Sequence, residues 1–111
     1  YQQFIDAGVD NVYCISVNDA FVMNAWARDL ELKNVTMIPD GCGTFTRSMG
    51  MLVNKPKQGF GMRSWRYSTL IKDGAVVRFF EEPGFNNFSN DDDPYEVSDP
   101  DTMLKYLNER I

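Results

Sequence analysis

Hydrophobic and polar residues follow one another along this chain in short blocks, each typical of one helix or one strand. Residues 1–7 carry apolar positions up to Gly8, a residue that commonly ends a helix, so this block predicts the last turns of a helix. The next block, residues 11–17, is a compact run of valine, tyrosine, cysteine and isoleucine between polar neighbours. Such a run predicts a buried strand.

A helix is predicted over residues 20–30, with Asn18 or Asp19 as its cap. Residues 35–38 then predict a short strand, which the turn at 39–41 stops. The spacing of apolar residues in the helix is approximately helical and gives its expected buried side: Phe21, Met23, Ala25, Trp26 and Leu30.

The middle of the chain contains its clearest turn. Residues 44–51 predict a short helix, and the segment 54–62, rich in glycine, lysine and proline, predicts a loop. The runs 64–72 and 75–82 predict a β-hairpin, because the dipeptide Asp73-Gly74 between them favours a two-residue turn.

The last part of the chain predicts a loop and then a helix. Residues 83–100 are acidic and contain three prolines, which indicates an exposed loop, and the helix begins near Ser98 or Asp99. Its buried side is expected to carry Met103, Leu104, Tyr106 and Leu107. Strands that alternate with helices predict an α/β fold in a single domain over residues 1–111, and the hairpin makes its sheet mixed.

Composition and charge exclude several classes of function. The 111 residues carry a net charge of −5, which is a poor electrostatic match for nucleic acid or an anionic membrane. No apolar run reaches the roughly 18 residues of a membrane span, and we expect neither a signal peptide nor a membrane anchor but a cytoplasmic protein. Without any histidine, the sequence excludes Cys/His zinc sites and Ser-His-Asp triads.

Two cysteines are too few for a disulfide scaffold, and each has its own interpretation. Cys14 lies within the apolar strand block, where a small buried and inert side chain is expected. Cys42 lies between two glycines just before a predicted helix, so it is either an accessible, redox-sensing thiol or a loop thiol without function. The acidic run 91–93 lacks the alternating spacing of a calcium loop and predicts a solvated segment.

Several short sequence motifs of this chain occur together in one known family. They are VNDAFV at 17–22 with Trp26, PDG at 39–41, GFG at 59–61, RSWRYS at 63–68, KDG at 72–74, and VSD at 97–99 with Met103 and Leu104. In this order the chain resembles the atypical, type-5-like peroxiredoxins of the thioredoxin-like superfamily, and among them the bacterial form fused to a glutaredoxin domain. The resemblance covers nearly the whole chain and implies a thioredoxin-like fold with a mixed central sheet flanked by helices.

The resemblance also shows what this sequence lacks. The family's peroxidatic cysteine stands in a Pro-x-x-x-Thr-x-x-Cys motif upstream of the first predicted helix, and residues 1–111 contain no such motif. We therefore expect an N-terminally truncated domain that is inactive alone. By the same resemblance, the strand before that motif lies between the strand of Cys14 and the strand of Tyr67. Without it, the chain is expected to be weakly stable, to aggregate or to borrow a strand.

The resemblance assigns its main chemical role to Arg66. In the family, the arginine at this position points at the peroxidatic sulfur, where a fixed cation lowers the thiol pKa and a guanidinium can hold the peroxide oxygens. The alternative is a surface arginine, or a cation–π partner of Trp65 or Tyr67. Arg63 either pairs with an acid at a dimer surface or is solvated.

The implied activity is that of a thiol peroxidase, which reduces hydrogen peroxide and alkyl hydroperoxides. Glutathione, glutaredoxin or thioredoxin is the implied reductant, a homodimer is the implied assembly, and no metal or organic cofactor is implied. The alternative is a peroxiredoxin-like binding or assembly domain that has kept the fold without the nucleophile.

Overall fold

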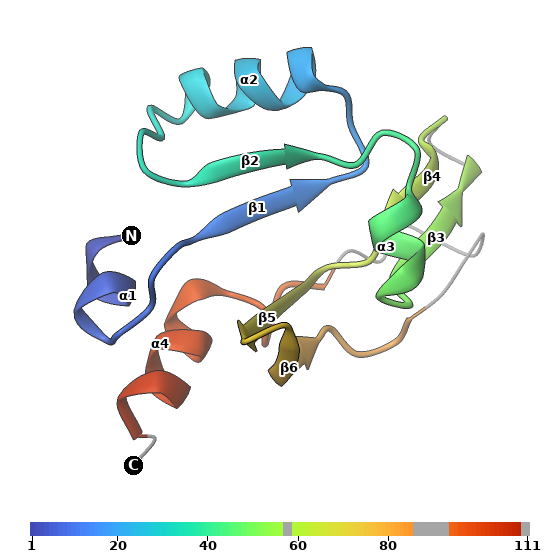
Figure 1. Cartoon of the computed structure of the whole chain (residues 1–111). Coiled ribbons are helices and arrows are strands. Elements are labelled where there is room, and N and C mark those ends of the chain that lie inside the picture. Colours follow the sequence, from blue (N-terminus) through green and yellow to red (C-terminus); the bar gives the residue numbers. More distant parts are fainter. Residues whose placement is uncertain (57–58, 86–93, 110–111) are drawn as a thin grey trace.

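The computed structural model describes residues 1–56, 59–85 and 94–109 and shows an α/β arrangement (Figure 1). Helices and strands alternate in the first half, two antiparallel hairpins follow, and a helix ends the chain. In chain order the elements are α1 (Gln2–Asp6), β1 (Tyr13–Ser16), α2 (Ala20–Asp29), β2 (Thr36–Pro39), α3 (Thr44–Ser48), β3 (Leu52–Lys55), β4 (Gly61–Ser64), β5 (Tyr67–Lys72), β6 (Ala75–Glu81) and α4 (Pro100–Glu109).

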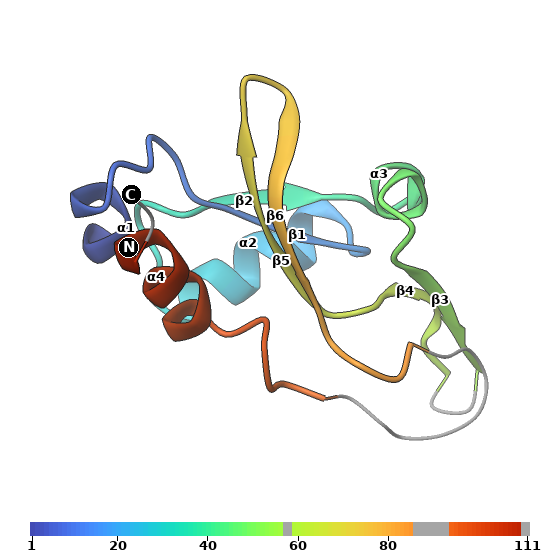
Figure 2. The ribbon, with the colours of Figure 1, turned by 90° about the horizontal axis from the view of Figure 1, so that it is seen from below.

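The N-terminal half is a layer of two parallel strands covered by one helix. β1 pairs with β2 in parallel, from Tyr13 opposite Thr36 onward, and α2 lies along this pair in both views (Figures 1 and 2). The carboxylate of Asp19 accepts the Val22 amide at 2.8 Å and caps α2. This confirms the predicted strand, helix, cap and second strand.

The side chains of this layer are less buried than the sequence predicts. Only Met23 of the predicted α2 stripe is buried, and the other four positions are exposed: Phe21, Ala25, Trp26 and Leu30. β1 is not a buried strand either, because Tyr13 is 56% exposed and the rest of β1 is half-buried. Two strands cover only a narrow strip of a helix, which accounts for both differences.

The segment predicted as a loop at 54–62 contributes to a hairpin instead. β3 and β4 pair antiparallel, with Val53 opposite Arg63 and Lys55 opposite Gly61. Pro56 and Gly59 belong to the connection between these strands, whereas Lys55 and Gly61, which also suggested a loop, are paired within them. Residues 57 and 58 lie outside the described part of the chain.

The second hairpin follows the sequence closely. Asp73 and Gly74 have φ angles of 52° and 79°, the left-handed pair that a tight two-residue turn requires, and β5 pairs with β6 on either side. The predicted first strand starts too early, however. Ser64 belongs to β4, and Trp65 and Arg66 separate β4 from β5.

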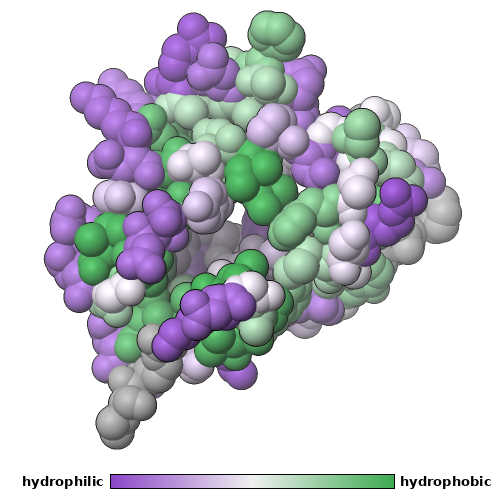
Figure 3. All heavy atoms as spheres, in the orientation of Figure 1, coloured by the Kyte–Doolittle hydropathy of each residue, from purple (hydrophilic) through white to green (hydrophobic). Residues whose placement is uncertain are grey.

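The strands form three separate pairs rather than one continuous mixed sheet. Among the described residues, β1 pairs only with β2, β3 only with β4, and β5 only with β6. In the orientation of Figure 3, the surface is hollowed between the β1–β2 layer and the β5–β6 hairpin, with hydrophobic residues on its rim. The expected strand between Cys14 and Tyr67 stays a prediction.

The buried residues are spread over both halves of the chain, and one cluster of them lies in the middle. Met51, Val53 and Trp65 form a buried cluster, on which Met49, Tyr67 and Phe79 pack. On α4, Met103, Leu104 and Leu107 are buried as predicted, while Tyr106 is half-buried and meets the Phe80 ring edge-on at 6.1 Å. Helix α3 is shorter than predicted and ends at Ser48. None of the described helices is both long and apolar enough to cross a membrane.

Candidate functional site around Arg66

Arg66 lies in the short connection between β4 and β5, directly after a buried tryptophan. The Trp65 side chain is 4% exposed, its backbone N–H donates to the Met51 carbonyl at 2.7 Å, and its indole Nε1 donates to the Glu82 carbonyl at 2.8 Å. The Glu82 N–H in turn donates to the Arg66 carbonyl at 3.2 Å. These contacts fix the Arg66 backbone between the core cluster and the end of β6.

The Arg66 guanidinium lies over the ring of Tyr95. Its Cζ is 4.9 Å from the ring centroid, within the range of a cation–π interaction. Trp65 and Tyr67, the partners considered from the sequence, make other contacts: Lys55 lies over Trp65, and Tyr67 stacks on Phe79 at 5.0 Å. Tyr95 lies 29 positions further along the chain, so no local pattern indicated it.

Glu82 is a buried acid that the sequence analysis treated only as the end of a strand. Its side chain is 0% exposed, and its carboxylate accepts the amides of Glu96 at 2.7 Å, Val97 at 2.9 Å and Ser98 at 2.6 Å. The predicted loop is present at 96–98 and is exposed at Glu96, but Val97 is half-buried and Ser98 is buried. This carboxylate accepts the backbone amides of all three residues. Residues 86–93, including the acidic run, lie outside the described residues.

The ionisation of Glu82 follows from these contacts. Burial alone would raise the pKa of Glu82. The side chain of Ser98 and the hydrogen bonds from the three amides favour the charged form and lower the pKa to about 2. The Ser98 hydroxyl is buried and has no hydrogen-bond partner by geometry, so the hydrogen bonds to the Glu82 carboxylate are those of the three amides. Glu82 is therefore a stable anion at neutral pH. An acid directly after an apolar strand and before a proline was the one signal for it in the sequence.

Arg63 lies on β4, where it is paired with Val53 of β3. Its Nη1 donates to the Met62 carbonyl at 3.0 Å, and its Cζ is 5.8 Å from the Phe60 ring centroid. These contacts hold the side chain along its own strand. The role of Arg63 at a dimer surface stays a prediction.

A second carboxylate, Asp40, holds the start of α3. It accepts the Thr46 amide at 2.8 Å, the Thr46 hydroxyl at 2.6 Å and the Phe45 amide at 3.3 Å. Burial would raise the pKa of Asp40, but these hydrogen bonds lower it overall. Burial, and then the negative charge of Asp40, raise the pKa of Tyr67, which places the two side chains in one electrostatic environment.

The two cysteines differ in exposure. Cys14 is half-buried in β1, and burial raises the pKa of its thiol, which disfavours the reactive thiolate. This agrees with the inert role expected for it. Cys42 is exposed in the turn before α3, so its thiol is accessible. Helix α3 has only five residues, so its N-terminus offers little stabilisation to a thiolate.

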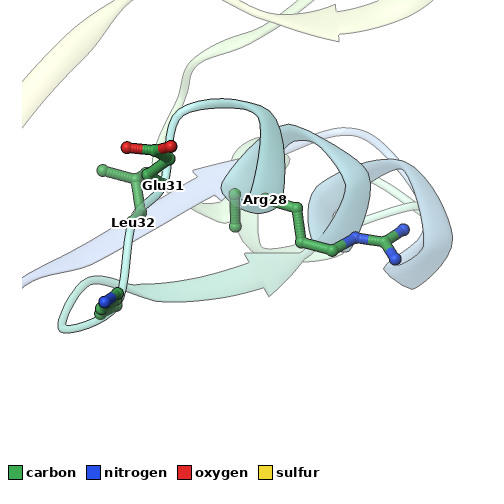
Figure 4. A pocket seen from close by; sticks show the side chains of 5 residues that line it. Arg28, Glu31 and Leu32 are labelled. Atoms are coloured by element: carbon green, nitrogen blue, oxygen red, sulfur yellow. The ribbon is translucent and has the colours of Figure 1, made fainter.

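Across residues 1–56, 59–85 and 94–109, no three acids or cysteines come together as metal ligands. An open hollow at the C-terminal end of α2 is lined by Ala27, Arg28, Glu31, Leu32 and Lys33. Figure 4 shows the Arg28 and Glu31 side chains extending in different directions there, so they do not converge on one point.

Comparison with known proteins agrees with the resemblance. The Redoxin family model matches residues 1–96. A peroxiredoxin of Rhizobium etli is 56% identical over 107 residues, which are 96% of this chain and 59% of that protein. A hybrid peroxiredoxin of Haemophilus influenzae is 56% identical over 100 residues, which are 90% of this chain and 39% of that protein.

Solved structures give the same result. The 1-Cys peroxiredoxin of Plasmodium falciparum superposes with a TM-score of 0.91 at 32% identity, over 99% of this chain and 62% of that one. A reduced peroxiredoxin of Vibrio vulnificus in complex with hydrogen peroxide gives 0.83 at 34% identity, over 97% and 62%. The chain thus spans less than two thirds of these relatives. It has the thioredoxin-like peroxiredoxin fold and belongs to the Redoxin family as a peroxiredoxin, close to the type-5 and hybrid forms.

Proposed function

We propose that residues 1–111 are the C-terminal majority of a single peroxiredoxin domain that reduces hydrogen peroxide and alkyl hydroperoxides. The observation that carries the proposal is Arg66, the cation of the RSWRYS segment, which is held by its backbone to Glu82 and by its guanidinium over Tyr95. A freely solvated surface arginine needs no such support. The hydrogen peroxide bound to the Vibrio vulnificus relative supports this substrate class.

In the proposed reaction, the attacking cysteine comes from a segment outside this sequence. Its thiolate attacks one peroxide oxygen, so that an S–O bond forms, the O–O bond breaks and the second oxygen leaves as hydroxide or alkoxide, which takes up a proton. The Arg66 charge lowers the pKa of the thiol, and its planar donors stabilise the charge that moves onto the leaving oxygen. A thiol reductant, namely glutathione, glutaredoxin or thioredoxin, returns the sulfenic acid to the thiol.

Neither cysteine of this chain suits the attacking role. Cys14 is half-buried with a raised pKa, and Cys42 lies in the turn before α3. We therefore propose that the 111 residues alone are inactive, and that the longer protein works in the cytoplasm as a homodimer.

Substitution of Arg66 in the full-length protein tests the proposal. Arg66→Ala should slow peroxide reduction by about 100-fold or more, as loss of a fixed charge-stabilising donor does elsewhere, and should raise the pKa of the reactive thiol. Arg66→Lys should recover only part of the rate, because an ammonium lacks the planar donor fork. Arg78→Ala removes an exposed arginine that lies over Phe80 and Tyr106, and it is the matched control, expected to keep the normal rate.

Two results would contradict the proposal. A normal rate of peroxide reduction in Arg66→Ala would show that Arg66 does not have the proposed role. A rate for residues 1–111 alone within about tenfold of the full-length protein would show that no outside nucleophile is needed, since loss of a nucleophile costs several powers of ten. An inactive full-length protein would favour the alternative of a binding or assembly domain.

A further inference from the structure

A single acidic residue joins the two segments that meet at the Arg66 guanidinium. The backbone N–H of Glu82 donates to the Arg66 carbonyl at 3.2 Å, while its carboxylate accepts the Glu96 amide at 2.7 Å. Glu96 directly follows Tyr95, the residue whose ring lies against the guanidinium. The Glu82 main chain is therefore bonded to Arg66, and the Glu82 side chain is bonded to Glu96, the residue next to Tyr95.

We propose that Tyr95 is a positioning residue for the Arg66 guanidinium, and that Glu82 keeps Tyr95 in place by binding the backbone of the three residues that follow it. The inference rests on the proposed peroxidase role of Arg66 and extends it to a residue that touches neither peroxide nor sulfur.

An aromatic ring is well suited to hold an arginine that must act on a thiolate. The ring attracts the cation through its quadrupole and so restricts how the guanidinium can tilt. It carries no net charge, so this contact leaves the positive charge of Arg66 in force, and it occupies none of the N–H donors. A carboxylate in the same place would pair with those donors and offset the charge that lowers a thiol pKa.

Because Tyr95 is largely exposed, its role in positioning Arg66 can be tested apart from any role in packing the core. Its side chain is 56% exposed, whereas Trp65 beside Arg66 is 4% exposed. Truncation of Tyr95 therefore removes little buried area and should leave the stability of the fold nearly unchanged. The backbone that follows Tyr95 is anchored at 96–98, because moving it would break hydrogen bonds to a buried anion.

Three variants of the full-length protein test the inference. Tyr95→Leu removes the ring, Tyr95→Phe keeps its face, and Tyr106→Leu removes the ring beneath a different arginine, Arg78, at 5.5 Å. Two measurements are made on each: the pH profile of the peroxide-reduction rate, and the ¹⁵N relaxation of the Arg66 side-chain Nε–H group, which reports its order without any need for activity. Melting temperatures are recorded beside them.

We expect Tyr95→Leu to lower the rate about threefold to tenfold, the size of one cation–π contact. Its pH profile should shift upward, and the Arg66 Nε–H should lose order. Tyr95→Phe should match the parent in both measurements. Tyr106→Leu should melt at a lower temperature yet keep both the rate and the order of Arg66, because it loosens α4 rather than the site.

The two proposals fail in different ways. If Arg66 stays equally ordered in Tyr95→Leu, or if Tyr95→Phe is as impaired as Tyr95→Leu, Tyr95 does not position Arg66, whatever the rate. If Arg66 loses order in Tyr95→Leu but the full-length parent reduces no peroxide, the peroxidase function is overturned, and with it the purpose assigned to Tyr95.

Discussion

Two buried carboxylates hold backbone in this protein, one near β2 and one at the end of β6, and they act over different lengths of chain. Asp40 binds the amide and hydroxyl of Thr46, six residues further on, and so begins α3. Glu82 binds three amides that lie 14, 15 and 16 residues further on, and so joins β6 to the approach of α4.

The difference teaches what each carboxylate stabilises. Asp40 completes a local turn. Of the residues it binds, Thr46 is fully buried and Phe45 is 39% exposed, so water can replace only the bond to Phe45. Glu82 is fully buried, and its removal leaves several amides without an acceptor, far from the residue that served them. The first carboxylate shapes one element, whereas the second holds two parts of the fold together.

The largest effect is expected from Glu82→Gln. The neutral amide offers one acceptor oxygen and turns an NH₂ group toward backbone donors, so we expect a loss of about 3–5 kcal/mol in the free energy of unfolding. Chemical denaturation of the full-length protein measures this, and amide exchange should rise at 96–98. Glu81→Gln, at the exposed neighbouring position, is the control and should stay near the parent. Equal stability of the two variants would show that the carboxylate is not needed.

The second-largest effect is expected from acid, which should weaken the hydrogen bonds that the Glu82 carboxylate accepts from 96–98. The pKa of Glu82 is about 2 in the folded protein, below its ordinary value of 4.5, so its contribution is complete above pH 4.5 and is lost as pH falls toward 2. A shift of this size corresponds to about 3 kcal/mol. Unfolding curves measured between pH 6 and pH 2 should show the loss in the parent and in Glu81→Gln. An identical acid loss in Glu82→Gln would assign it to other carboxylates.

A smaller effect is expected from Asp40→Asn. The amide keeps one acceptor for the start of α3 but no longer holds both the amide and the hydroxyl of Thr46, so we expect a loss of about 1–2 kcal/mol. The exposed Asp10→Asn is the control. Amide exchange should rise within α3 and stay unchanged at 96–98. Increased exchange at 96–98 would show that the two carboxylates stabilise one unit and not two separate parts of the fold.

The sequence predicted those features that local chemistry determines. The β5–β6 hairpin depends on Asp73 and Gly74 taking left-handed φ angles, which adjacent residues decide. The cap of α2 by Asp19 is equally local. The family and its fold followed from words spread over the whole chain, and they agree with the comparisons.

Features that depend on distant partners could not be read in this way. The predicted stripe of α2 failed because burial depends on the layer beneath a helix, and two strands cover only Met23 fully. The β3–β4 pair was missed because its strands depend on cross-strand bonds, while Pro56 and Gly59 dominate the local pattern. Arg66 was found through the resemblance, but Glu82 and Tyr95 meet it across 16 and 29 positions of the chain, which no spacing rule connects.

The reach of the Glu82 contact also has a consequence for the order of folding. The β5–β6 hairpin closes through a two-residue turn, whereas the bonds from Glu82 to 96–98 require the closure of a much longer loop, which costs more chain entropy. We therefore expect these bonds to form after the folding transition state. Bonds that form late change the unfolding rate far more than the folding rate. On this view Glu82 determines how long the protein remains folded, while the turn at Asp73-Gly74 determines how quickly it folds.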